Sequence, residues 1–253
     1  MKRRTALSLG LGAYLLALLV TAPATLADAA LQRVSEGRLR LAEAQGTLWS
    51  GAGLLEIRDA RGQAGIARDF AWRVVPQSLL RAQLVCDVKL EKASQRFPVT
   101  LSASGIELAN AEIDMPAAAL GLAVPRLAPL GLTGEVLIHV ASLSIARDAV
   151  VGDATLRWRA AGSKLTPVSP LGNYELRLDG EGRTVRAVLR TVNGPVQLDG
   201  KGSWAKGARP VFLATIRVLP RHQEQLAPLL RLIAVEHGSG NFELSSNQPA
   251  FGS

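Results

Sequence analysis

The sequence is poor in the residues that most often carry catalysis or bind metals. In its 253 residues it has one cysteine, Cys86, and three histidines, His139, His222 and His237. A single cysteine excludes an intrachain disulfide, and the isolated histidines lack the spacing typical of zinc sites. The chain also has no G-x-x-x-x-G-K-[ST] phosphate loop and no G-x-S-x-G nucleophile elbow. We therefore expect no metal, no cofactor and no catalytic residues, and do not expect an enzyme.

Aromatic residues and clustered charges are also scarce. Aromatic residues make up 4% of the chain, and the formal net charge is +8. Apart from Lys2, Arg3 and Arg4 at the start, the basic residues alternate with apolar ones. Nucleic-acid-binding proteins more often show a basic stripe interleaved with aromatic side chains. The charge therefore indicates solvated strand faces, and we expect no nucleic-acid partner.

Only one long hydrophobic run is present. Residues 5–27 carry no charge, and at about 1.5 Å per residue a helix of this length spans a hydrocarbon core of about 30 Å. The three basic residues before it predict a cytoplasmic N-terminus and an exported remainder. A cleaved signal peptide is the competing interpretation, because Ala22-Pro23-Ala24 and Thr25-Leu26-Ala27 are small-residue cleavage sites. These residues alone leave both interpretations open.

Beyond the hydrophobic run, the dominant pattern is alternation of apolar and polar residues, which is typical of half-buried strands. We predict strands at residues 38–44, 55–57, 69–74, 83–91, 96–103, 135–143, 154–160, 174–178, 185–190, 196–204, 210–218 and 241–245. The turn residues Asp179-Gly180-Glu181-Gly182 and Asn193-Gly194-Pro195 favour tight hairpins and hence antiparallel neighbours. Short helical connections are predicted at 116–122, at 129–130 and at 222–235.

These elements predict the fold class. A sheet of ten or more strands twists by about 20–25° per strand pair, so it must coil, fold over or close. The strand glycines Gly51, Gly53, Gly200 and Gly202 suit such bends. We expect a mainly β protein: one long curled antiparallel sheet, folded over or half-barrel-like, with a few short helices, preceded by one N-terminal transmembrane helix.

Two tryptophan motifs stand out among the few aromatic residues. The segment Gly46-Thr47-Leu48-Trp49-Ser50-Gly51 is interpreted as a glycine-bounded turn into a strand, with Trp49 packed on the apolar side. The dipeptides Trp72-Arg73 and Trp158-Arg159 are each followed by a proline-containing stretch and then a strand. This short internal echo suggests two related halves.

Several motifs together resemble the type II secretion system protein N family, also called general secretion pathway protein N. They are the 46–51 segment (Gly46, Trp49, Gly51), the 72–80 segment (Trp72, Pro76, Leu79, Leu80), the 170–176 segment (Gly172, Tyr174), the 193–200 segment (Gly194, Pro195) and the 202–204 segment (Gly202, Trp204). Their order and spacing cover nearly the whole chain. One departure is Pro195-Val196, where the family pattern has Pro-Leu.

The resemblance implies an accessory component of the type II secretion machinery in the inner membrane of a Gram-negative bacterium. It implies a retained single-pass anchor, with residues 1–27 as basic start and membrane segment and residues 28–253 as a periplasmic β domain. The expected partners are other inner-membrane subunits of the system and inner-membrane lipid, and the expected role is to contribute to export of folded proteins across the outer membrane. The family brings no catalytic residues.

The apolar strand faces keep a second function class open. Such rows are Leu84, Cys86, Val88 and Leu90; Phe97, Val99 and Leu101; and Tyr174, Leu176 and Leu178. Aligned on neighbouring strands, they form a surface that either packs on protein or holds acyl chains. The alternative function is thus a periplasmic lipid-binding or lipid-transfer β-groove protein, with bound lipid as its ligand; a periplasmic enzyme ranks third.

Overall fold

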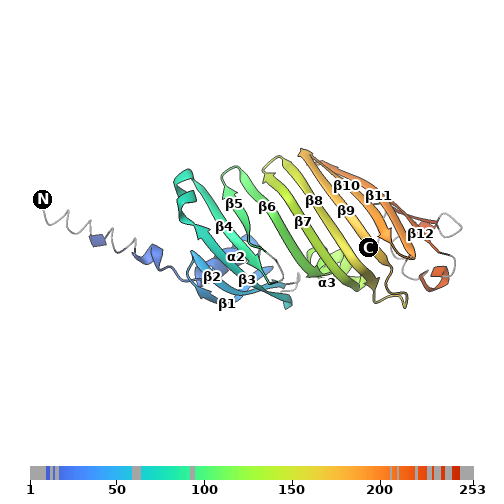
Figure 1. The fold of residues 1–253 in the computed structure, drawn as a ribbon, viewed down its shortest axis with the longest axis horizontal. Helices are drawn as coiled ribbons and strands as arrows, with labels where there is room; N and C mark the ends of the chain where they lie inside the picture. The colour runs from blue at the N-terminus through green and yellow to red at the C-terminus, as the bar shows by residue number, and fades with distance from the viewer. Residues whose placement is uncertain are drawn as a thin grey trace. The chain divides into compact units, whose positions relative to one another are not determined.

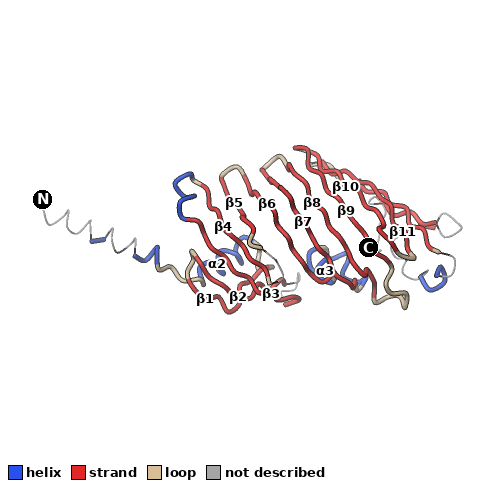
Figure 2. Tube along the Cα trace, in the orientation of Figure 1, coloured by secondary structure: helices blue, strands red, loops and turns tan. Residues whose placement is uncertain are grey.

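The computed structural model describes residues 10, 11, 14, 17–58, 64–91, 95–205, 207–209, 211–219, 222–226, 230, 235–236 and 241–245. The chain divides into two compact units, Met1–Glu91 and Lys92–Ser253. Strands dominate both units, and the helices are short (Figures 1 and 2).

Unit 1 is an antiparallel sheet whose strands follow one another in sequence order. Its elements are α2 (Thr25–Val34), β1 (Leu39–Gly46), β2 (Ser50–Arg58), β3 (Ala64–Val75), the 3-10 helix η1 (Pro76–Arg81) and β4 (Gln83–Leu90). Each strand pairs with the next through a hairpin connection. The β1–β2 turn and η1 therefore lie at the same end of this sheet, because antiparallel neighbours reverse direction at each connection.

The core of unit 1 forms around Trp72. Trp72 is buried with Ala24, Leu41 and Val74, and its ring lies 5.9 Å from that of Phe70 between centroids. Cys86 is half-buried against this cluster, and burial raises the pKa of its thiol. Its place among apolar side chains is that of a small hydrophobic residue.

Unit 2 is a longer antiparallel sheet (Figure 1). Its elements are β5 (Phe97–Ser102), β6 (Gly105–Pro116), α3 (Ala118–Ala123), η2 (Pro125–Leu130), β7 (Leu132–Ala146), β8 (Val150–Ser163), β9 (Gly172–Gly182), β10 (Thr184–Asn193), β11 (Val196–Ala205), β12 (Val211–Val218), β13 (Val235–Glu236) and β14 (Asn241–Ser245). The order is sequential from β5 to β12 and then β14 and β13. Among the described strands, β13 at one edge does not pair with β5, so the sheet is open.

Strand register in unit 2 gathers apolar side chains on one side, which we call the apolar face. Directly paired residues share a face, and one such row consists of Ile138, Leu156, Leu176 and Leu189. The opposite, polar face carries pairs such as Glu135 with Arg159. At one end the apolar face is covered by η2 and by helical residues at 222–226, which close a core. Its buried members are Leu130, Val168, Leu171, Val196, Ile216, Val218, Leu226, Leu230 and Phe242.

The expected mainly β, antiparallel fold with few short helices is confirmed, and three local differences have physical reasons. Strand β6 was not predicted because the alternation of its apolar residues changes at Asn110, which has φ +50°, although its pairing register with β7 is unbroken. The apolar residues lie at even positions before Asn110 (Ile106, Leu108) and at odd positions after it. Helix α2 was not predicted because its alanine-rich sequence lies where a cleavage site was considered. The helix predicted at 222–235 extends too far in the prediction, because Val235 belongs to strand β13.

Of the predicted N-terminal membrane helix at 5–27, the structure describes residues 10, 11, 14 and 17–27. Residues 17–20 are helical and the chain turns at Thr21. Within the part of the chain that the structure describes, no helix has both the length and the apolar character needed to cross a bilayer.

Candidate functional site

The motif residues of unit 1 meet at one end of its sheet, which we call the turn end (the 46–51 segment and η1). Gly46 has φ +94°, a conformation that glycine adopts without steric cost. The turn closes when Thr47 N donates to Ser50 O at 2.9 Å and Ser50 N donates to Thr47 Oγ1 at 3.2 Å. The 46–51 segment is therefore a tight turn from β1 into β2, with no cluster of reactive groups.

Trp72 fixes this turn from the neighbouring strand. Its Nε1 donates to Leu48 O at 3.0 Å, and Gly51 lies directly under its ring. A Cβ added at Gly51 would be 2.5 Å from Trp72 Cζ2, so only glycine leaves room for the indole. Three of the family-motif residues, Gly46, Gly51 and Trp72, thus belong to one packing arrangement.

A short N-terminal strap, residues 22–24, is bonded to the same turn. Leu48 N donates to Ala22 O at 2.8 Å, and Ala24 N donates to Gly46 O at 3.2 Å. Both alanines are buried, and Trp49 Nε1 donates to Leu19 O at 2.8 Å. The small residues considered as a cleavage site are therefore used in packing, a role that the sequence alone did not indicate.

The remaining motif residues of unit 1 belong to η1. Pro76 opens it, where a missing N–H costs nothing. Ser78 Oγ donates to Val75 O at 2.7 Å and accepts from Val85 N at 3.1 Å, which holds the connection in place. Leu79 is exposed, and Leu80 is 91% exposed. In a sequence, two adjacent leucines usually indicate buried core residues, so this exposure could not be predicted.

In unit 2, Gly172, Tyr174, Gly194 and Pro195 come together at the covered end of the apolar face. Gly194 has φ +136°, and a side chain there would strike the backbone of Gly172. The hydroxyl of Tyr174 lies 3.1 Å from Leu171 O and 2.9 Å from Val196 O. Burial raises the pKa of Tyr174, so the hydroxyl stays protonated and donates.

Gly202 and Trp204 lie at the other end of the same strand, away from that cluster. Gly202 lies under the ring of Phe212, whose Cδ2 would be 2.7 Å from an added Cβ. Trp204 is exposed, on the apolar face opposite Val185. The structure therefore does not join the predicted motif residues of unit 2 into one site.

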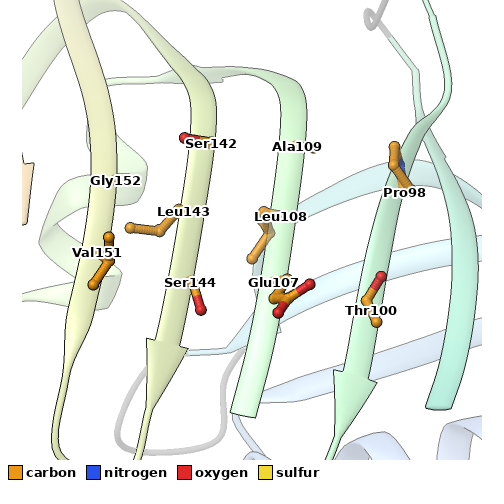
Figure 3. Close-up of a pocket in the computed structure, with 10 residues that line it drawn as sticks. All are labelled: Pro98, Thr100, Glu107, Leu108, Ala109, Ser142, Leu143, Ser144, Val151 and Gly152. Carbon is orange, nitrogen blue, oxygen red and sulfur yellow. The ribbon is translucent and has the colours of Figure 1, made fainter. Parts of the chain in front are cut away.

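Two of the hollows along the sheet of unit 2 lie on its opposite faces. A cavity of about 190 Å³ lies at the covered end of the apolar face, lined by residues that include Leu127, Leu130, Trp158 and Tyr174. It is smaller than the ~300–1,000 Å³ of typical small-molecule sites. A groove on the polar face, shown in Figure 3, is lined by Thr100, Ser142 and Ser144 among others, and Glu107 is its one charged lining residue.

The polar face carries a concentrated charge cluster around Glu175. The Glu175 side chain is 9% exposed, and three arginines that are 47–57% exposed surround it. Its Oε1 accepts from Arg190 Nη2 and Arg177 Nε, each at 2.8 Å, and its Oε2 accepts from Arg157 Nε at 3.1 Å. Hydrogen bonds from Arg190, and secondarily from Arg157 and Arg177, outweigh burial and lower the pKa of Glu175 from 4.5 to about 2.

Among the described residues, no group of three or more His, Cys, Asp or Glu side chains could hold a metal ion. Glu175 is saturated by arginines. The chemistry that the described residues offer is apolar packing and charge pairing.

Comparison with known protein families identifies the family to which the chain belongs. The family described as type II secretion system (T2SS), protein N, matches residues 37–245. The chain belongs to this family, which makes it a component of the type II secretion system and implies contacts with other subunits of that system. No curated protein and no solved structure matches the chain.

Proposed function

We propose that the chain is an accessory inner-membrane subunit of the type II secretion system that contributes to export of folded proteins across the outer membrane. Its N-terminal segment is the anchor, and the bulk of the chain lies in the periplasm. Support for this orientation comes from the uncharged run at 5–27 after Lys2, Arg3 and Arg4. The protein acts by binding, without catalysis.

The observation that carries the proposal is the incomplete covering of the apolar face of unit 2. At the end away from η2, Ile106, Ile145 and Trp204 are exposed on that face. Ile106 and Ile145 are directly paired, so they extend one row of apolar side chains. Burial of apolar surface is worth about 25 cal/mol per Å², and a contiguous exposed patch marks an interaction site. We propose that another subunit of the secretion system packs here.

A photo-reactive amino acid at Ile106 should cross-link the full-length protein to another secretion subunit in intact cells. The matched control is Glu107, its exposed neighbour on the polar face of the same strand. We expect several-fold more cross-linked product from position 106, with the partner identified by mass spectrometry. Equal cross-linking from both positions, or cross-linking from position 107 alone, would contradict a binding role for the apolar face.

The alternative, lipid binding, is favoured by one observation, the apolar cavity at the covered end. If it holds an acyl chain, phospholipid should co-purify stoichiometrically with the full-length protein from mild detergent. Leu198 lines the cavity, so L198W should displace the lipid, whereas Q197W on the exposed side of β11 should not. Mass spectrometry of the co-purifying lipid tests this, and lipid-free protein in all three forms rules the carrier function out.

A further inference from the structure

The turn end of unit 1 exposes apolar side chains beside the end of the hydrophobic N-terminal run. Leu80 is 91% exposed and Leu79 beside it is exposed as well. Leu18, Leu19 and Val20, which lie in the run just before the strap at 22–24, are also exposed. Such a patch is unfavourable in water, because burial of each exposed leucine would lower the free energy.

Hydrogen bonds connect the segments that carry these apolar groups. Trp49 Nε1 donates to the carbonyl of Leu19, in this part of the run. The carbonyl of Trp49 in turn accepts from Val74 N at 2.7 Å, and η1 begins two residues after Val74. The strap at 22–24 is bonded to the same turn, so no free linker separates the hydrophobic run from the sheet.

The chemistry of this end is that of a membrane interface. Residues 46–50 and 76–83 contain no carboxylate, and Arg81 follows the leucine pair. Tryptophan and arginine are enriched at the level of lipid head groups, where an indole has one apolar and one wet side and a guanidinium reaches phosphate. Leucines next to them suit the boundary with the acyl chains.

We propose that the turn end of unit 1 rests on the lipid bilayer: Leu79 and Leu80 enter it, Trp49 lies at the head-group level and Arg81 faces lipid phosphate. This inference rests on the proposed membrane anchor. A bilayer is favoured over a protein partner because the exposed leucines lie at the same end of unit 1 as the strap that joins the hydrophobic run to the sheet. It gives the motif residues Trp49, Leu79 and Leu80 a shared role in holding unit 1 at the membrane.

Unit 1 itself offers a matched control at its other end. Val34, at the C-terminal end of α2, is 86% exposed. It precedes β1, which runs from Leu39 toward the turn, so Val34 lies at the end opposite η1. A label at position 34 therefore reports on a similarly exposed apolar position that we expect to lie away from the lipid.

The test uses the full-length chain in nanodiscs of phosphatidylethanolamine and phosphatidylglycerol, with or without doxyl-labelled lipid. An environment-sensitive fluorophore is attached to L80C or to V34C, both in a C86A background so that any destabilisation is shared. We expect doxyl lipid to quench the label at position 80 several-fold more than the label at position 34.

Equal quenching at both positions would overturn the proposal, as would a blue-shifted label at position 80 that doxyl lipid does not quench, since this indicates a protein contact. Failure of the anchor is a different result: the protein would not co-purify with nanodiscs. That outcome overturns both the membrane location and the contact of the turn end, whereas retained protein with unquenched position 80 overturns the contact alone.

Discussion

Replacing Trp72 by alanine should lower the free energy of unfolding by about 3–5 kcal/mol, the range for truncating a fully buried aromatic residue. Trp72 is 5% exposed and central to the core of unit 1. The substitution also leaves Leu48 O without the indole donor. Gly51, against the ring, has no side chain that could move into the space that the indole leaves.

Urea unfolding monitored by circular dichroism checks this value, and two variants serve as controls. W72F keeps a ring in place but loses the N–H donor, so it should cost less than W72A. W49A should also cost less, because Trp49 is only half-buried. Loss of secretion in W72A cells should follow the loss of protein. A W72A protein of normal stability and abundance that no longer supports secretion would instead show that Trp72 acts through a contact.

The alternation of apolar and polar residues allowed most strands to be predicted, because a half-buried strand must repeat every two residues. It failed for β6, where the positive φ of Asn110 moves the apolar set from even to odd positions. The sequence does not show in advance that a non-glycine residue adopts such a conformation, so the interrupted alternation was not recognised as one strand. The C-terminal end of the helix predicted at 222–235 was wrong because strand pairing overrides the helical pattern there: Val235 pairs with Glu243 of β14.

The tryptophan echo has a structural counterpart that spacing alone could not show. Trp72 Nε1 donates to Leu48 O, and Trp158 Nε1 donates to Thr133 O at 2.9 Å. In each case the acceptor precedes the indole by about the same length of chain, on or next to the strand before it. The two Trp-Arg dipeptides thus mark equivalent positions in the two units.

The candidate surfaces were less predictable than the strands. The motif residues were identified as a set, but which of them meet depends on register: the turn end unites Gly46, Gly51 and Trp72, while Trp204 lies far along β11 from Gly194. The cluster around Glu175 was missed for the same reason. Arg157, Glu175 and Arg190 lie on three successive strands and become neighbours only once those strands are paired.

Replacing Glu175 by glutamine should destabilise the protein by about 1.5–3 kcal/mol at pH 7, the range for hydrogen bonds to charged groups. The carboxylate is nearly buried, and without it Arg157, Arg177 and Arg190 repel one another with no anion between them. We do not expect the three arginine contacts to add up to several times this value, because the arginines are about half exposed and remain solvated.

The pH dependence of this difference is the sharper measurement. The pKa of Glu175 is lowered from 4.5 to about 2 in the folded protein, so its stabilising contribution is complete above about pH 4.5. It declines as the pH falls below 4.5 and is lost as the pH passes through about 2, below which the carboxyl is protonated in both states. The difference between wild type and E175Q in urea unfolding should therefore shrink between pH 4.5 and pH 2.

A matched exposed pair separates this effect from general surface charge. Glu181 pairs with Arg186 at 2.8 Å, and both side chains are more than half exposed. Exposed pairs contribute about 0–1 kcal/mol, so E181Q should change stability little at any pH. If E175Q and E181Q behave alike at pH 7, or if the E175Q difference is unchanged down to pH 2, the arginines do not hold a permanently charged Glu175 and the cluster is an ordinary solvated patch of the polar face.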